Sequence, residues 1–353
     1  MRGSVAIVGG GVGGLALAGG LHRSGWAVTV FERADGLPTV GTGLGIWPSA
    51  LRALDELGLG TVARERGLVQ PDGAMRRPDG SVIATLDVAR IRRRHGEGVR
   101  LLSRPALLGL LAEALPAGAV RFGEAVTDPS ALTEAYDVVA GADGIRSATR
   151  VAMFSDRFPL RYSGMTAWRG TVAMDLPAGG ETWGRGRKFG LTPQAPGVTN
   201  WYAAVAAPEG FRPPEGDVAV LRRWFGDWHD PVPAVLDRVD AAGVLHHDVH
   251  MVPALPSYVR GRLVLLGDAA HAMTPDLGQG ACQALIDAVA LVDALAACSD
   301  VTSALARYDA RRRRATQRMA AMAAWASRLA QVRRFVGVRD AALRAALSFG
   351  PPG

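Results

Sequence analysis

The chain has 353 residues, of which 48% are hydrophobic and 21% charged, which is an ordinary globular composition and excludes a disordered or low-complexity chain. This length allows a large core divided between two lobes, but not a string of independent domains. The formal charge of +7 comes from scattered arginines, one short cluster at Arg311–Arg314 and a single lysine, Lys188, a pattern that favours a solvated helix face over a nucleic-acid partner.

No apolar run reaches the roughly 18 residues that span a bilayer, and the N-terminus enters a predicted strand almost at once. We therefore expect a cytoplasmic protein, a monomer or a homodimer, without a secretory signal or a stable membrane association. Cys282 and Cys298 lie in an alanine-rich helical pattern, which indicates small core residues rather than a disulfide or a metal site.

The first 31 residues predict a strand, a glycine-rich turn, a helix and a second strand. Residues 4–8 are β-rich, and Gly9, Gly11 and Gly14 follow with the spacing G-x-G-x-x-G. The first glycine permits a tight turn, the second lets the backbone approach a pyrophosphate, and the third lets the helix pack on the strand. Because the helix N-terminus offers free N–H groups and a partial positive charge, this spacing predicts a dinucleotide site.

Glu32 ends the second strand, which we expect at residues 28–31. An acidic residue at this place can accept hydrogen bonds from the ribose hydroxyls of adenosine. A glycine-rich turn without a ligand would leave this acid unexplained, so we favour the dinucleotide site. The motif alone does not separate FAD from NAD.

The middle of the chain predicts a mixed sheet. "MTAWRGTV", "GRGRKFGLTP" and "TNWYAAVA" have the composition of strands and are separated by glycine and proline turns. Arg169, Arg187, Trp201 and Tyr202 are the candidates in them for substrate contact. Each could instead be a packed sheet residue or a solvent-facing charge.

The stretch "LHHDVH", residues 245–250, is the one place that suggests a metal. Its histidines lack matching cysteines or a carboxylate cluster, and His246 and His247 should face opposite ways on a strand. We expect a polar strand end here and no metal.

The stretch "GRLVLLGDAAHAMTPDLGQG", residues 261–280, places an apolar strand before Gly267 and Asp268, then a proline loop, then a glycine-rich helix start. Folding alone requires neither a carboxylate at a strand end nor a helix start without bulky side chains. The helix that follows has apolar residues at helical spacing and should pack on the core. From about residue 296 onward, alanine and arginine alternate at helical spacing and predict long amphipathic helices.

These pieces, together with "YDVVAGADGIRSATR" and "LLSRPALLGLL", resemble the single-component FAD-dependent aromatic monooxygenases of the p-hydroxybenzoate hydroxylase type. The resemblance is nearest to the salicylate hydroxylase, urate hydroxylase and zeaxanthin epoxidase branch, and it covers most of the chain. One departure is Ser49, where the family commonly has asparagine after "WP". The resemblance implies an α/β fold with a Rossmann-like FAD-binding domain of the GR2 type, a mixed β-sheet substrate domain and C-terminal helices.

The implied FAD-binding domain is discontinuous in sequence. We expect the FAD-binding domain at residues 1–70, 98–160 and 255–295, the substrate-binding sheet domain at 71–97 and 160–255, and the C-terminal helices at 296–353.

The resemblance also carries FAD contacts over by position. Glu32 and Arg33 would hold the adenosine end of FAD, and Val126 would lie beside the adenine. Arg104 would reach the phosphate or ribityl region. The expected cofactor-binding residues are Gly9, Gly11, Val12, Gly13, Gly14, Glu32, Arg33, Gly45, Arg104, Val126, Asp143, Gly144, Gly267, Asp268, Pro275, Gly278 and Gly280.

Physical chemistry supports two helix starts for one cofactor. FAD is negatively charged at its pyrophosphate and, when reduced, at its isoalloxazine ring. The helix start after Gly14 would serve the first region, and a second at Gly278–Gly280 would serve the ring. Asp268 can accept hydrogen bonds from ribityl hydroxyls, and Pro275 sets a rigid turn beside the ring.

The family's reaction is the expected one. NADPH or NADH binds transiently and reduces FAD, and a flavin C4a-hydroperoxide formed with O2 then hydroxylates or epoxidises an electron-rich aromatic or unsaturated small molecule. The protein positions this substrate and keeps water out. Arg187, Tyr202 and Asp276 are the catalytic candidates. Asp143 and Gly144 match a motif that the family uses for FAD and for the pyridine nucleotide.

Two alternatives stay open at this point, and a third is disfavoured. The chain could be a flavin-dependent oxidoreductase without oxygen insertion, or a non-catalytic flavin-binding protein. A flavin halogenase is disfavoured, because Lys188 is the only lysine and no W-x-W-x-I-P stretch is present.

Overall fold

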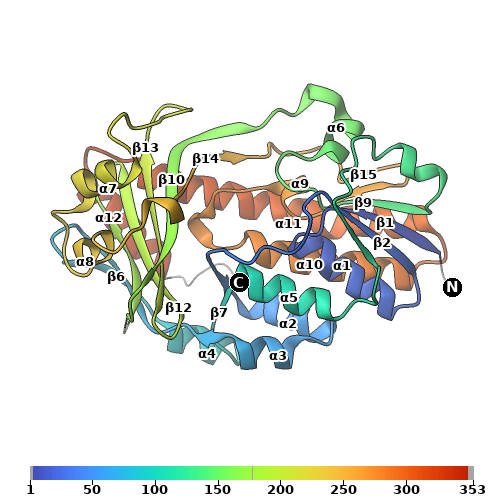
Figure 1. The fold of residues 1–353 in the computed structure, drawn as a ribbon, viewed down its shortest axis with the longest axis horizontal. Helices are drawn as coiled ribbons and strands as arrows, with labels where there is room; N and C mark the ends of the chain where they lie inside the picture. Colours follow the sequence, from blue (N-terminus) through green and yellow to red (C-terminus); the bar gives the residue numbers. More distant parts are fainter. Residues whose placement is uncertain (1–2, 177, 349–353) are drawn as a thin grey trace.

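Two large sheets lie toward opposite ends of the molecule in the computed structural model, which describes residues 3–176 and 178–348 (Figure 1). The long helix α11, Val301–Ala330, extends between them and contacts strands of both sheets, β15 (Val259–Arg260) and β10 (Arg161–Ala173). The C-terminal helices therefore tie the two sheets together.

The first sheet has six strands and is parallel except at its β15–β16 edge. Its central strands are continuous apolar runs that are buried on both faces, as expected for a parallel sheet covered by helices. In spatial order the strands are β15, β16 (Leu263–Leu265), β9 (Val138–Gly141), β1 (Ser4–Val8), β2 (Ala27–Glu32) and β8 (Val120–Phe122).

Helices cover this sheet and enclose the largest apolar core. They are α1 (Val12–Arg23), α2 (Pro48–Glu56), α3 (Gly60–Arg66), α5 (Arg104–Glu113), α6 (Ala148–Phe154), α9 (Asp268–His271), α10 (Gly280–Ala297) and part of α11. The predicted strand, turn and helix at the N-terminus are confirmed, although the helix begins three residues earlier than its apolar spacing suggested.

The second sheet is mixed, with seven strands joined by antiparallel pairs except between β11 and β5. One face packs on α7 (Asp217–Phe225) and α8 (Val232–Leu236), and residues of α11 and α12 (Val336–Ser348) join a separate apolar cluster with this sheet. In spatial order its strands are β14 (Leu245–Met251), β10, β13 (Val198–Ala206), β12 (Arg187–Ala195), β11 (Gly179–Trp183), β5 (Gly73–Arg76) and β6 (Val82–Leu86).

A small third sheet, in the order β3 (Gly43–Ile46), β7 (Arg100–Ser103) and β4 (Leu68–Val69), lies beside β12 of the second sheet. The remaining elements are α4 (Val88–His95) and the short 3-10 turns Ala131–Glu134, Ser155–Arg157, Ala241–Gly243 and Pro275–Leu277. This architecture confirms the predicted α/β fold class, while the predicted domain boundaries stay a prediction.

One helix meets the length and composition of a membrane span although polar residues, among them Asp287 and Asp293, interrupt its apolar run. Helix α10 is 18 residues long and apolar enough, by length and composition, to cross a membrane. In the fold it packs between α1, α2 and α11, and 61% of this window is buried inside the protein. It also carries the buried charge of Asp287, so α10 is a core helix.

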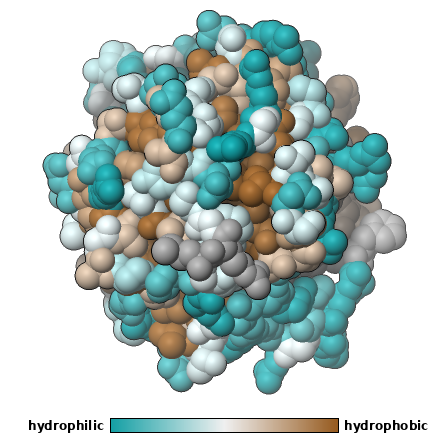
Figure 2. Space-filling model, turned by 90° about the vertical axis from the view of Figure 1, so that its right-hand side faces the viewer, coloured by the Kyte–Doolittle hydropathy of each residue, from teal (hydrophilic) through white to brown (hydrophobic). Residues whose placement is uncertain are grey.

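On the face at the six-stranded end of the molecule, hydrophilic and apolar side chains are interspersed (Figure 2).

Candidate cofactor and substrate site

The glycine-rich turn after β1 leaves no room for a side chain at Gly9 or at Gly14. A Cβ on Gly14 would lie 2.0 Å from the carbonyl oxygen of Gly9, and one on Gly9 would lie 2.4 Å from that of Ala142. Gly9 also has φ of +106°, a conformation that disfavours residues with a side chain. The turn therefore brings the start of α1, at Val12 and Gly13, directly onto the end of β1 and leaves its first N–H groups for an anion.

Glu32 is held rigidly beside this turn. Its Oε2 accepts a hydrogen bond of 2.6 Å from the amide of Gly10, and its Oε1 accepts one of 2.9 Å from Ala34. An ionised carboxylate has about four acceptor positions, so both oxygens can still accept from ribose hydroxyls. Arg33 is exposed next to it, and Val126 is half-buried against the core of the first sheet.

Arg104 reaches the same turn from α5. Ser103 caps this helix by accepting from the amide of Ala106, and Arg104 is its first residue. A guanidinium nitrogen of Arg104 lies 4.0 Å from where a Cβ on Gly11 would stand. A positive side chain and the α1 N-terminus thus lie together, which suits a pyrophosphate.

The Asp-Gly pair after β9 forms another part of the site. Asp143 Oδ2 accepts hydrogen bonds of 3.0 Å from the amide and the hydroxyl of Thr149, while its Oδ1 is buried and has no partner among the residues that the structure describes. Gly144 has φ of +77° and open space where a Cβ would stand. The pair therefore offers a free acceptor beside open space.

Asp268 is exposed within an otherwise buried stretch from residue 263 to residue 272. Gly267 precedes it with φ of +59°, which turns the chain out of β16 and into α9. The Oδ1 atom of Asp268 lies 3.9 Å from where a Cβ on Gly280 would stand, at the start of α10. The carboxylate and the second helix start are thus neighbours, as the sequence suggested.

We call residues 273–280, which lead to the second helix start, the cofactor loop; β3, α2 and α10 pack against it. Pro275 begins its 3-10 turn, and Gly278 ends it with φ of +61°. A Cβ on Gly278 would lie 3.6 Å from Trp47, and the thiol of Cys282 donates to the carbonyl of Gly45, 3.3 Å away. Strand β3, α2 and α10 thus meet at this loop.

Five of the ten buried side-chain polar atoms that lack a hydrogen-bond partner among the described residues lie in the segments that form this site, which we call the cofactor segments. Buried donors and acceptors are normally paired, so such a concentration indicates a polar ligand. Those in the cofactor segments are Ser49 Oγ, Asp143 Oδ1, His271 Nδ1, Thr274 Oγ1 and Gln279 Nε2. The carbonyls, hydroxyls and ring nitrogens of FAD supply both donors and acceptors, so the residues present fit this cofactor.

A largely buried ionic cluster joins the cofactor loop to the second sheet. This cluster consists of Glu181, Lys188, Tyr202 and Asp276. Lys188 is 2% exposed, and its Nζ lies 3.0 Å from Asp276 Oδ1 and 3.5 Å from Glu181 Oε1. The Tyr202 hydroxyl donates to Glu181, as does Trp183 Nε1 at 2.6 Å. Two predicted catalytic candidates, Tyr202 and Asp276, are therefore brought together by two residues that the sequence analysis missed.

The charges in the cluster favour an ionised lysine. Burial by itself lowers the pKa of Lys188, but the negative charges of Asp276 and Glu181 and their hydrogen bonds outweigh it, and the pKa is raised. With two carboxylates and one ammonium, the cluster carries one net negative charge. A lone lysine within an arginine-rich strand pattern was the signal that could have pointed to it.

Arg187, the third catalytic candidate, lies apart from the cluster. Successive side chains of a strand point to opposite faces, so Arg187 and Lys188 cannot both face the cofactor loop. Arg187 instead stacks over the rings of Phe225 and Trp228, with centroids 5.8 and 5.7 Å away. It lines a cavity of about 470 Å³ on the α7 side of the sheet.

The other candidates of the middle strands divide in the same way. Trp201 is buried and stacks on Phe189 in the α7-side core. Arg169 pairs across strands with Tyr202; although its side chain is exposed, the partial loss of water around it and the positive charge of Arg104 lower its pKa. Arg169 therefore lies toward the cofactor segments, on the same side as the ionic cluster.

The histidines of β14 lie in separate surroundings. His246 stacks on Trp168, and His250 pairs with Glu209 at 2.8 Å. Burial and the charge of Arg169 lower the pKa of His247 to about 4. Across residues 3–176 and 178–348, no group of three His, Cys, Asp or Glu side chains could hold a metal ion.

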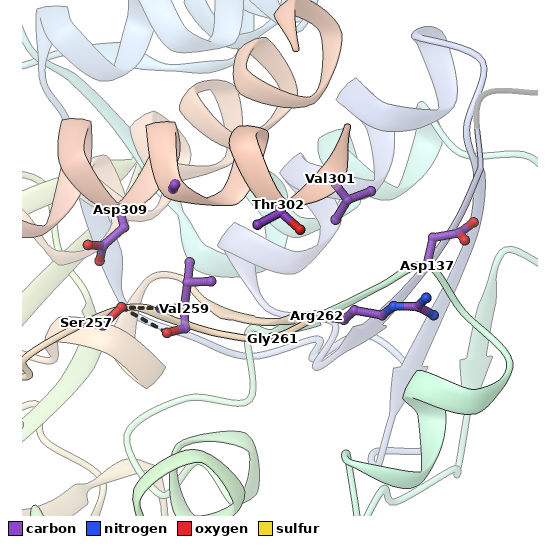
Figure 3. Close-up of a pocket in the computed structure, with 9 residues that line it drawn as sticks. Asp137, Ser257, Val259, Gly261, Arg262, Val301, Thr302 and Asp309 are labelled. Atoms are coloured by element: carbon purple, nitrogen blue, oxygen red, sulfur yellow. Dashed lines mark hydrogen bonds between the residues drawn. The ribbon is translucent and has the colours of Figure 1, made fainter. Parts of the chain in front are cut away.

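A cavity of about 530 Å³ is lined by residues of β15, of the turn before β16 and of α11 (Figure 3). Its lining residues Gly261 and Arg262 precede β16, whereas Asp268 follows that strand, so the two places are at opposite ends of it. The acids in its wall are already engaged, since Asp137 accepts from Ser4 and Asp309 accepts from the amide of Tyr258.

We expect Asp268→Ala to bind FAD about 10- to 100-fold more weakly than the wild type, because ribityl hydroxyls lose a charged acceptor. Titration of the apoprotein with FAD, followed by flavin fluorescence, measures this. Asp293→Ala is the matched control, because Asp293 lies on the neighbouring helix α10 and pairs with Arg311 at the surface. Wild-type affinity in Asp268→Ala would show that the ribityl chain lies elsewhere.

Comparison with known proteins indicates the same cofactor, FAD. The profile of an FAD-dependent oxidoreductase family matches residues 4–160, and that of an FAD binding domain family matches residues 233–323. The aurachin C monooxygenase/isomerase of Stigmatella aurantiaca is 36% identical over 326 residues, which are 87% of this chain and 84% of that protein.

Two further similarities concern urate. The FAD-dependent urate hydroxylase of Klebsiella pneumoniae is 30% identical over 330 residues, covering 87% of this chain and 85% of that protein. The solved structure of HpxO from Klebsiella pneumoniae, complexed with FAD and uric acid, superposes with a TM-score of 0.88 at 26% identity. That superposition covers 98% of this chain and 92% of the other.

Proposed function

This chain belongs to the single-component FAD-dependent aromatic monooxygenases, and from that premise we propose which substrate it takes and how its side chains serve the reaction. It is an FAD-dependent monooxygenase. We propose that its substrate is a small electron-rich aromatic or heteroaromatic molecule whose ring carries an O–H or N–H group. The ionic cluster at the cofactor loop is the observation that carries this proposal.

The cluster offers an acceptor to the substrate. The Tyr202 hydroxyl uses its hydrogen toward Glu181, so the lone pairs of its oxygen are left to accept a hydrogen bond. A substrate O–H or N–H group can therefore donate to Tyr202, and its proton can move to Tyr202 as the Tyr202 proton moves to Glu181. The substrate becomes more electron-rich, and Glu181 becomes neutral.

Lys188 and Asp276 hold the ionic cluster in position for this proton transfer. Their ion pair joins β12 to the 3-10 turn that begins at Pro275, so the substrate sheet keeps one position relative to the cofactor loop. The oxygen activation that FAD supplies when bound and reduced is the cofactor's own chemistry. The residues that would hold FAD are the glycine turn, Glu32, Arg104, Asp143 and Asp268.

The reductant in this proposal is NADPH or NADH, bound transiently. The sequence has one G-x-G-x-x-G turn, at Gly9–Gly14, and FAD takes it. We place the enzyme in the cytoplasm, where these nucleotides are available. Its two cysteines are both free, which suits a reducing compartment.

A stopped-flow screen tests the function. We expect a suitable hydroxylated or N–H aromatic to accelerate flavin reduction by NADPH or NADH and to yield a product one oxygen heavier by mass spectrometry. Tyr202→Phe is the matched variant, since the phenyl ring keeps the packing. It should bind FAD normally and lose about 10²- to 10⁴-fold in product formation, the usual contribution of acid–base catalysis.

Two results would count against the proposal. Reduction without an oxygenated product, for every ring offered, would favour an oxidoreductase that does not insert oxygen. Full product formation by Tyr202→Phe would remove the proton-transfer role from the ionic cluster.

A further inference from the structure

A line of buried side chains leads from α11 to the start of α10. Arg312 Nη2 donates to Gln283 Oε1 at 2.6 Å, and Gln283 Nε2 donates to Gln279 Oε1 at 3.3 Å. Gln279 is the N-cap residue of α10, between two glycines of the cofactor loop. Helix α11 is thus connected to the cofactor loop by hydrogen bonds among three side chains.

Arg312 is itself fixed by a buried acid. Asp287 is 0% exposed; its Oδ1 accepts from Arg312 Nε at 2.5 Å, and its Oδ2 accepts from Gly267 at 2.9 Å and His271 at 2.6 Å. Burial by itself raises the pKa of Asp287, but the charges of Arg312 and His271 and these hydrogen bonds lower it to about 2. Asp287 is therefore ionised and holds Arg312 in one place.

The guanidinium of Arg312 can only donate hydrogen bonds, and this fixes the orientation of both glutamine amides. The guanidinium of Arg312 must face the oxygen of the Gln283 amide, which turns the NH2 group of Gln283 toward Gln279. Gln279 must then present its own oxygen to Gln283. Only the NH2 group of Gln279 is left over.

That NH2 group is buried and without a partner among the described residues. Gln279 is 1% exposed, and its Nε2 makes no hydrogen bond. A buried donor is normally paired, so an acceptor is missing at this place. Gln279 directly precedes Gly280, where a Cβ would lie 3.9 Å from the carboxylate of Asp268.

We propose that Gln279 donates a hydrogen bond from Nε2 to an acceptor of FAD, a carbonyl oxygen or ring nitrogen of the isoalloxazine, and that Arg312, acting through Gln283, is the positioning residue that presents this donor. The proposal rests on the FAD site alone and needs neither the substrate nor the reductant.

The expected signature is redox-dependent binding. A hydrogen bond to a charged acceptor is roughly twice as strong as one to a neutral acceptor, so reduced anionic flavin should depend on Gln279 more than oxidised flavin. In Gln279→Met we expect oxidised FAD to bind about fivefold more weakly and reduced FAD to lose about tenfold more than that. A tenfold difference corresponds to a two-electron potential about 30 mV lower.

Three further variants test separately whether Gln279 is the donor and whether Gln283 orients its side chain. Gln279→Glu has no donor on an ionised side chain and adds negative charge, so its potential should fall further than that of Gln279→Met. Gln283→Met frees the Gln279 amide to turn and should shift affinity and potential in the same direction, by less. Gln331→Met is the control, because Gln331 bonds to Ser163 at the far end of α11 and should leave both values unchanged.

The measurements are titration of apoprotein with FAD, the potential from reduction against a reference dye, and the melting temperature of the apoprotein. The melting temperature of Gln279→Met should stay close to that of the wild type, because one unpaired donor is removed along with one weak bond. Unchanged FAD affinity and reduction potential in both Gln279 variants would overturn the proposal that Gln279 donates to FAD. A shift in those two variants but none in Gln283→Met would overturn the role of Arg312.

Failure of this inference is distinct from failure of the proposed function. A wild-type protein that oxygenates a ring while Gln279→Met keeps its potential would refute only the donor. A wild-type protein with the predicted potential shift but no oxygenated product would refute only the substrate proposal.

Discussion

Gly14→Ala is expected to purify without bound FAD. Its Cβ would stand 2.0 Å from the carbonyl oxygen of Gly9, a separation that real Cβ atoms do not show, and the atom it meets is backbone that cannot rotate away. Helix α1 would have to move off β1, and its first N–H groups would leave the position they hold beside Glu32 and Arg104. We expect FAD affinity to fall by more than about 100-fold, since several charge-assisted hydrogen bonds depend on that position.

The ratio of flavin absorbance near 450 nm to protein absorbance measures the effect directly. Gly109→Ala is the matched control, because Gly109 also lies within a helix but has nothing within 4 Å of a Cβ. It should keep full FAD and gain up to about 1 kcal/mol of stability from the better helix propensity of alanine. A Gly14→Ala protein as yellow as the wild type would mean that the phosphates do not lie on this turn.

Lys188→Met should lower the free energy of unfolding by about 3–5 kcal/mol at pH 7, the usual cost of breaking a buried ion pair. It leaves Asp276, whose side chain is 4% exposed, and Glu181 without their ammonium. Because the folded-state pKa of Lys188 is raised, this contribution is complete below the unfolded pKa of about 10 and is lost only as pH rises above the folded value. Neutral pH is therefore the right condition for the measurement.

Urea denaturation followed by tryptophan fluorescence gives the free energies. Arg185→Met, three positions away at the surface, should change stability by less than about 0.5 kcal/mol. The double variant Lys188→Met with Asp276→Asn removes one charge of each sign and should recover part of the loss. A single variant as stable as the wild type would show that Lys188 is not the counter-ion of the cluster.

The glycine turn and the place of Glu32 beside it could be predicted from the sequence because these parts are close in the chain. The spacing of Gly9, Gly11 and Gly14 between a strand and a helix imposes the turn, and the next strand places Glu32 at its side. Asp268 was also recognisable, because it interrupts an apolar run at the place where a strand ends. Local sterics and periodicity act within a few residues, so a sequence displays them directly.

The tertiary structure alone decided which side chains of distant segments meet. The choice between Arg187 and Lys188 depended on which face of the second sheet turns toward the cofactor loop, and strand periodicity does not reveal that. The pairing of Asp276 with Lys188 likewise needs two sheets docked in one orientation. Arg312 and Gln279 are joined only because α11 packs on α10. Local spacing determined the glycine turn and the acid beside it, whereas the packing of elements far apart in the chain determined which charged side chains meet.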